Sequence, residues 1–197
     1  MLLKAIPIDA YAQSQELNES ASLLSSPGGY EGRIRLVRFL DEPDGYCIDV
    51  PGPADRAILA MPAIAHTCHF DPLPDQVFIF NGNGNGMIRW EFGGRSACLT
   101  AASAQAEAPF SFEDCEANEL QNFTFKEIGE LRLSDSDLCL AVEATGPRFD
   151  EALEPRQDAR GRGRPVNPKF SHLARALQLS TCGEGDPSFQ RWQAYPD

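Results

Sequence analysis

The sequence has 197 residues, enough for one domain with a substantial core and too few for two. Its formal net charge of −12 argues against a nucleic-acid partner and against an anionic membrane surface, since both attract clustered Lys and Arg. No apolar run reaches the roughly 18 residues that a membrane span needs. The 15 prolines and 16 glycines predict many turns and little long helix, which favours an all-β fold.

Residues 1–31 lack a sustained periodicity and end in the turn-forming segment Ser25–Gly29. We expect an N-terminal extension, which either is disordered or docks on the body or on a partner. Lys4 and Pro7 interrupt the apolar stretch that a signal peptide requires, so a signal has been removed or there is none.

A first unit of four strands follows the extension. Asp41–Gly45 supplies the turn between the first two strands. The glycine-rich segment Asn81–Gly86 suggests a phosphate loop, but it leads into a strand and not into a helix, so we expect a tight connection and no nucleotide. The predicted strands are Arg33–Leu40, Tyr46–Val50, Ala57–Ile64 and Val77–Phe80.

Two further units repeat this order of features. Each unit has a cysteine in an apolar strand, a second cysteine at or near the end of another strand, and Gln-x-aromatic beyond it, and such a recurrence predicts an internal repeat. These residues are Cys47, Cys68 and Gln76–Phe78 in the first unit; Cys98, Cys115 and Gln121–Phe123 in the second; and Cys139, Cys182 and Gln190–Trp192 in the third.

This triple pattern, over residues 32–192, resembles the ricin-type β-trefoil lectins, the QxW family. The resemblance implies a β-trefoil at 32–197, with four-stranded lobes at about 32–80, 81–125 and 126–197 around a pseudo-threefold axis. It further implies a non-catalytic carbohydrate-recognition module that binds a galactose-like glycan and needs no cofactor. Phe78, Phe123 and Trp192 are expected in the core.

Six cysteines allow fifteen pairings, from which the repeat selects Cys47 with Cys68, Cys98 with Cys115, and Cys139 with Cys182. An even number of cysteines at repeating positions favours an oxidising compartment, secreted or periplasmic. The alternative is a set of buried, reduced thiols in a cytosolic protein.

A sugar site of the family type is expected in the first repeat only. Asp49 stands where the family has the carboxylate that binds sugar hydroxyls, and Gln76 is its supporting glutamine. His66 occupies the position of the stacking aromatic residue, and Asp75 replaces the usual Asn. Because an ionised Asp75 cannot donate a hydrogen bond and would repel Asp49, the alternative is an inactive site.

In the other two repeats Thr100 and Ala141 replace the acidic residue, and we expect structural roles only. Gln121 and Gln190 would then satisfy buried backbone groups. His66 and His69 have metal-like spacing, but a disulfide-bonded Cys68 could not ligate zinc, and calcium between Asp49 and Asp75 is a weaker possibility. No nucleophile lies in a recognisable catalytic motif, so enzymatic activity is not expected.

An insertion rich in arginine, Gly146–Phe170, lengthens the third repeat. On an acidic protein it is a candidate contact for an acidic partner, or else a solvated loop. With the extension, it motivates a second hypothesis, an accessory or cell-binding subunit of a secreted toxin or enzyme complex that uses degenerate sugar sites as a protein interface. A Kunitz-type trefoil inhibitor with a reactive loop at Gly161–Arg164 is a third.

Overall fold

The computed structural model describes residues 23, 29–69, 71, 73–80, 86–126, 129–145, 148–149 and 173–195. In this part of the chain thirteen strands form one curled antiparallel sheet, which confirms the all-β class, and no helix there is long and apolar enough to cross a membrane. Two 3-10 turns, η1 (Ala54–Arg56) and η3 (Pro187–Phe189), lie between strands. The strands are β1 (Tyr30–Leu36), β2 (Tyr46–Asp49), β3 (Ile64–Thr67), β4 (Phe78–Phe80), β5 (Ile88–Phe92), β6 (Arg95–Ala101), β7 (Phe110–Glu113), β8 (Phe123–Phe125), β9 (Leu131–Leu133), β10 (Leu138–Val142), β11 (Arg148–Phe149), β12 (Leu173–Thr181) and β13 (Trp192–Tyr195).

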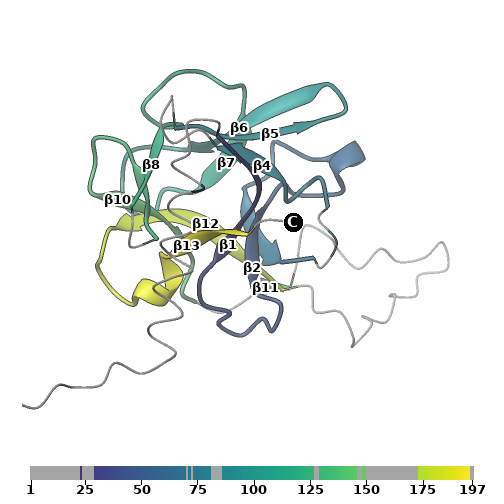
Figure 1. Cartoon of the computed structure of the whole chain (residues 1–197). Coiled ribbons are helices and arrows are strands. Elements are labelled where there is room, and N and C mark those ends of the chain that lie inside the picture. Colours follow the sequence, from purple (N-terminus) through teal and green to yellow (C-terminus); the bar gives the residue numbers. More distant parts are fainter. Residues whose placement is uncertain are drawn as a thin grey trace, which may run out of the picture.

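Pairing and single hydrogen bonds connect six of these strands in a ring, and Figure 1 labels β1, β4, β5, β8 and β13 among them. β1 pairs with β4 and β13, β4 with β5, and β8 with β9. Two backbone hydrogen bonds join the remaining neighbours, from Phe123 to the carbonyl of Gly86 at 3.0 Å and from Trp192 to that of Gly129 at 2.7 Å. Gly86 has a φ of 60°, and a Cβ there would lie 2.2 Å from the Phe123 carbonyl oxygen, so this junction requires glycine.

Three strand pairs carry the disulfides: β2 with β3, β6 with β7, and β10 with β12. The first cysteine of each repeat lies within the first strand of its pair, and the second follows the other strand by one or two residues. The bridges Cys47–Cys68, Cys98–Cys115 and Cys139–Cys182 confirm the pairing expected from the repeat.

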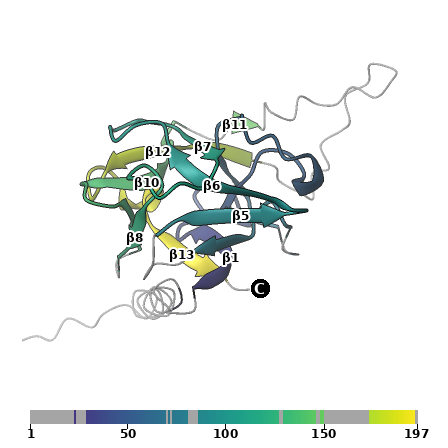
Figure 2. The same ribbon diagram turned by 90° about the horizontal axis from the view of Figure 1, so that it is seen from above.

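β12 departs from the repeated pattern because it belongs to two strand pairs. Its second half, Leu177–Thr181, pairs with β10, and its first half, Ala174–Ala176, pairs with β3 of the first repeat. β11 lies along its start, where Arg148 pairs with Ala174 (Figure 2). Arg148 and Phe149 of the insertion thus lie beside Leu173 and Ala174, close to the first repeat.

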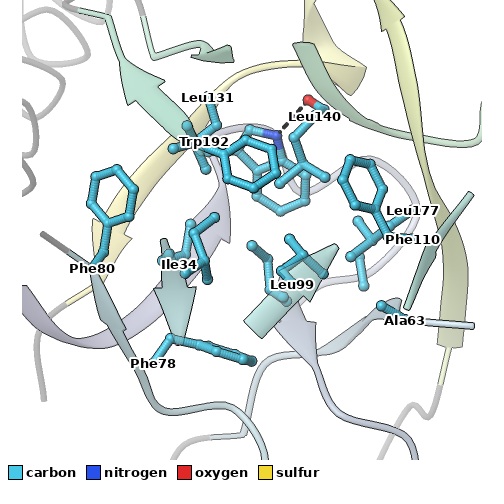
Figure 3. Packing of buried hydrophobic residues seen from close by; sticks show 14 of the residues in the cluster. Ile34, Ala63, Phe78, Phe80, Leu99, Phe110, Leu131, Leu140, Leu177 and Trp192 are labelled. Atoms are coloured by element: carbon cyan, nitrogen blue, oxygen red, sulfur yellow. Dashed lines mark hydrogen bonds between the residues drawn. The ribbon is translucent and has the colours of Figure 1, made fainter. Parts of the chain in front are cut away.

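The core fills the space between the ring and the hairpins (Figure 3). Phe78, Phe123 and Trp192 have exposed fractions of 0 to 1%, as predicted for the aromatic residues of the Gln-x-aromatic segments. The indole N–H of Trp192 donates to the carbonyl of Leu140 at 2.9 Å, so this buried donor is satisfied.

Two strand predictions were wrong in their bounds. The strand expected at Ala57–Ile64 begins only at Ile64 and runs to Thr67, because Pro62 cannot donate to a ladder and the chain turns between Ile58 and Met61. β1 starts at Tyr30, inside the predicted extension, and ends at Leu36. Residues 1–22 and 24–28 of the extension, Asn81–Asn85, and nearly all of the insertion lie outside the described residues.

Candidate functional site

The three glutamines make the same two backbone hydrogen bonds. Each side-chain N–H donates to the carbonyl just before the second cysteine of its repeat, and each side-chain oxygen accepts from the N–H just after that cysteine. The distances are 2.9 and 3.1 Å for Gln76, 2.8 and 2.7 Å for Gln121, and 3.2 and 3.1 Å for Gln190. The predicted backbone role of Gln121 and Gln190 is confirmed.

The remaining side-chain N–H of each glutamine donates to different groups in the three repeats. Gln76 donates to Asp49 Oδ2 at 2.7 Å, and Gln121 donates to the Thr100 hydroxyl at 2.9 Å. The Ala141 side chain offers no oxygen, and Gln190 donates instead to the Glu184 carbonyl at 2.9 Å and the Ser180 hydroxyl at 3.0 Å. Of the three glutamines, only Gln76 orients a carboxylate.

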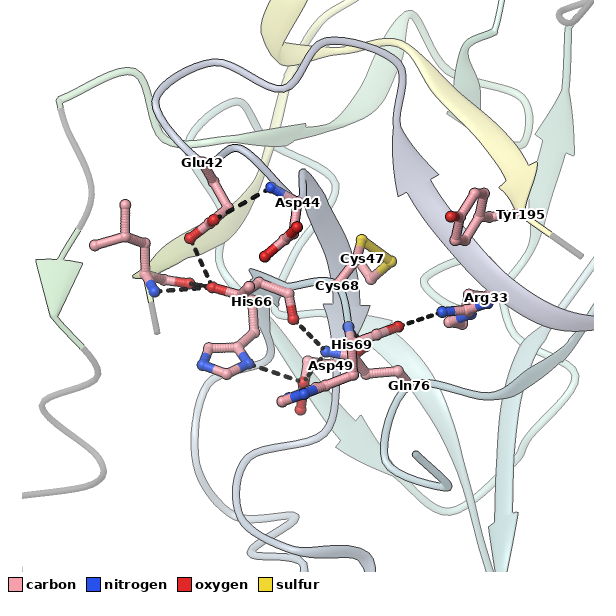
Figure 4. Close-up of a disulfide and its surroundings, with 12 residues drawn as sticks. Arg33, Glu42, Asp44, Cys47, Asp49, His66, Cys68, His69, Gln76 and Tyr195 are labelled. Atoms are coloured by element: carbon pink, nitrogen blue, oxygen red, sulfur yellow. Dashed lines mark hydrogen bonds and ion pairs between the residues drawn. A yellow bond between two sulfur atoms is a disulfide. The ribbon is translucent and has the colours of Figure 1, made fainter. Parts of the chain in front are cut away.

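Asp49 and His66 lie on neighbouring strands and face each other (Figure 4). Asp49 ends β2, His66 lies in β3, and His66 Nδ1 is 3.5 Å from Asp49 Oδ2. Their exposed fractions are 5 and 6%, and Gln76 is fully buried. The His66 ring, at the position expected for the stacking aromatic residue, therefore lies against Asp49 and is covered.

Asp75 is the fourth predicted residue, and it lies beside Asp49. Its backbone carbonyl accepts a hydrogen bond from Val50 at 3.0 Å, which fixes the segment before β4 against the end of β2. Burial and the charge of Asp49 raise the pKa of Asp75 to about 6. The structure thus gathers all four residues in the first repeat.

Sequence reasoning missed the residues around this cluster. Glu42, within the predicted turn Asp41–Gly45, is fully buried, and it accepts a hydrogen bond from the Thr67 hydroxyl at 2.8 Å. The same hydroxyl accepts from the backbone of Leu173 at 3.0 Å, so β12 is tied to β3 directly beside His66. Arg33 donates to the carbonyl of His69. No short-range sequence pattern predicts these long-range contacts.

The described residues offer no good metal centre. Among them, three ligating side chains come close together at Glu130, Cys139 and Cys182, but the two sulfurs already form a disulfide. A shallow pocket lies at the turn between β5 and β6, lined by residues 91–96, and shares no residue with the Asp49 cluster.

Residues 35–158 match the family described as ricin-type beta-trefoil lectin domain. The chain belongs to this family. As a ricin-type lectin domain it is a carbohydrate-binding module. No curated protein matches the chain.

Three solved structures place the lectin domain among β-trefoils. The agglutinin from Abrus precatorius is 19% identical with a TM-score of 0.58, over 88% of this chain and 51% of the agglutinin chain. The mdaA-1 domain is 15% identical with a TM-score of 0.55, over 84% and 89%. The Vibrio vulnificus hemolysin/cytolysin β-trefoil lectin, solved with N-acetyl-D-lactosamine bound, is 16% identical with a TM-score of 0.52, over 86% and 96%. At these identities the likeness is one of fold, and it confirms the β-trefoil.

Proposed function

We propose that this lectin domain recognises a glycan through the first repeat, with Asp49 as the acceptor of sugar hydroxyls. The observation that carries the proposal is the 2.7 Å hydrogen bond from Gln76 to Asp49, since the equivalent glutamines of the other repeats meet a threonine and a serine hydroxyl. A carboxylate held in a fixed orientation forms strong, charge-assisted hydrogen bonds to hydroxyl groups. A galactose-like sugar is the ligand that the family pattern suggests.

A glycan array probed with the oxidised protein tests this proposal. One small site binds weakly, with a Kd of about 1 mM, so the dense display of an array is needed to reveal binding. Asp49→Asn should weaken binding about 10- to 100-fold, because a charge-assisted hydrogen bond is lost. Thr100→Ala is the matched control, since Thr100 bonds Gln121 as Asp49 bonds Gln76, and it should bind like the wild type. A folded wild type that binds no glycan, or equal binding by Asp49→Asn, would contradict the proposal.

A second candidate is the accessory or cell-binding subunit of a secreted toxin or enzyme complex. It is favoured by the burial of Asp49 and His66, each more than nine-tenths covered, and by Thr100 and Ala141 at the acidic position of the other repeats. For this candidate, the oxidised protein would bind no glycan and would co-purify with a protein from its native source. The three disulfides support an oxidising compartment for either function.

A further inference from the structure

The first-repeat site holds two carboxyl groups, and they have unequal surroundings. Asp49 Oδ2 has the Gln76 amide at 2.7 Å and the His66 ring at 3.5 Å. Asp75 Oδ1 is buried, and no donor among the described residues reaches it. Of the two carboxyl groups, Asp75 is therefore the one with a buried oxygen that no donor stabilises.

The backbone hydrogen bond between Val50 and Asp75 makes it difficult for the carboxyl groups of Asp49 and Asp75 to move apart. It holds the backbone of Asp75 against the end of β2, and the charge of Asp49 acts on the Asp75 carboxyl, so two charges in this space would repel each other. The raised pKa of Asp75 agrees with this arrangement, since burial and the Asp49 charge both act against ionisation. A single proton placed on Asp75 removes the repulsion and leaves the Asp49 carboxylate ready to accept.

A neutral carboxyl group offers one O–H donor and one carbonyl acceptor, whereas an ionised one only accepts. The neutral form can therefore donate to a sugar hydroxyl that also faces Asp49. We propose that Asp75 binds the glycan as a neutral carboxyl that donates its O–H, so that the first-repeat site binds strongly only in mildly acidic solution. This inference rests on the proposed function, and it adds the pH range in which the site would bind the glycan strongly.

Other charged and titratable groups lie around Asp75, and their effects on binding have to be separated from its own. His66 faces the site from β3, and its protonation would favour an ionised Asp75, which opposes the effect. Asp49 faces it from β2. His69 follows β3, with its ring centroid 5.7 Å from that of His66, and Arg33 of β1 contacts the His69 carbonyl. Variants at Asp75 and His66 distinguish these contributions.

The test is the glycan array run at about pH 5 and about pH 7.5 with the wild type, Asp75→Asn and His66→Asn. If only the neutral form binds and its pKa is about 6, the wild type should bind about 30-fold more weakly at the higher pH. Asp75→Asn carries an amide donor at any pH, so it should bind equally at both. His66→Asn should keep the pH dependence of the wild type, whatever its absolute affinity.

Three results would overturn the inference and leave the proposed function intact. The wild type could bind glycans equally at both pH values, Asp75→Asn could keep the wild-type pH dependence, or His66→Asn could abolish it. If the wild type and Asp75→Asn, both folded, bind no glycan at either pH, the proposed function itself fails, and the inference fails with it.

Discussion

The glutamine of each repeat makes some hydrogen bonds that are common to all repeats and others that differ between them. These residues are Gln76, Gln121 and Gln190. Two hydrogen bonds of each side chain go to the backbone around the second cysteine, whatever the repeat contains elsewhere. The remaining N–H points to the position where the family has its acidic residue, or to a nearby hydroxyl. Loss of the carboxylate at Thr100 and Ala141 thus leaves the framework of these repeats unchanged.

The ionisation of Asp75 has a consequence for stability in the absence of any ligand. Its pKa is raised from the usual value to about 6, so the folded state binds a proton more tightly than the unfolded state does. The stability contributed by this proton is fully present below about pH 4 and is lost as the pH rises through about 6. Asp75→Asn should therefore be more stable than the wild type at about pH 7.5, and nearly equal to it at about pH 4.

The expected gain is about 1–2 kcal/mol, less than two pKa units would give, because the carboxyl is only partly shielded from solvent. Urea unfolding at the two pH values measures it. Asp55→Asn is the control, since the Asp55 side chain is 67% exposed, and it should show no such pH-dependent gain. A gain from Asp75→Asn that is the same at both pH values would refute the assignment of the proton to Asp75.

Part of the site was predictable at the level of single residues. Asp49, His66 and Gln76 were found from their spacing to the cysteines, because the repeat fixes which residues follow each strand. The covered state of His66 was not predictable, since it depends on β12, which is more than a hundred residues away in the sequence. The burial of Glu42 could not be predicted either, because a glutamate in a turn is normally solvated.

At the level of elements, Arg175 fixes β12 to the first repeat. Its guanidinium is 2.9 Å from Asp41 in the turn after β1, and it donates to the Glu143 carbonyl at 2.8 Å. Burial alone would raise the pKa of Asp41, but hydrogen bonds from Arg175 and Tyr46 hold it below its usual value. This contact joins the third repeat to the first.

Arg175→Ala should destabilise the protein by about 2–3 kcal/mol, because Arg175 is 5% exposed and its loss removes the buried donor shared by Asp41 and the Glu143 carbonyl. Urea unfolding gives the difference. Arg56→Ala removes an exposed pair with Asp55 and should change the free energy of unfolding by less than about 0.5 kcal/mol. Equal effects of the two substitutions would show that Arg175 does not join the repeats.

Strand positions were predicted where the sequence pattern ran without interruption, as in the alternation of β5 and the continuous apolar run of β10. The error at Ala57–Ile64 came from counting apolar residues across Pro62, although proline in such a run argues against a strand. The pairing of β12 with β3 could not be foreseen, since it joins different repeats across the insertion, and short-range patterns carry no register information at that separation.

At the level of the whole molecule, the disulfides close loops of different length. In the chain-entropy model a longer loop gives the greater stabilisation, and the separations are 43 residues for Cys139–Cys182 and 17 for Cys98–Cys115. Replacing both cysteines of the longer loop by alanine should cost about 4 kcal/mol, against about 3 kcal/mol for the shorter one. Urea unfolding of the two double variants measures the difference, and the opposite order would contradict the model.

The pairing of β12 with β3 also bears on how copies of this protein behave at high concentration. An edge strand with free backbone groups is a template for another chain, and such edges promote aggregation. Ile64, Ala65 and His66 are already paired with β12, so a second molecule cannot add a strand there. The single weak site that we propose would need many copies together on a glycan-bearing surface, and this pairing would limit aggregation under that condition.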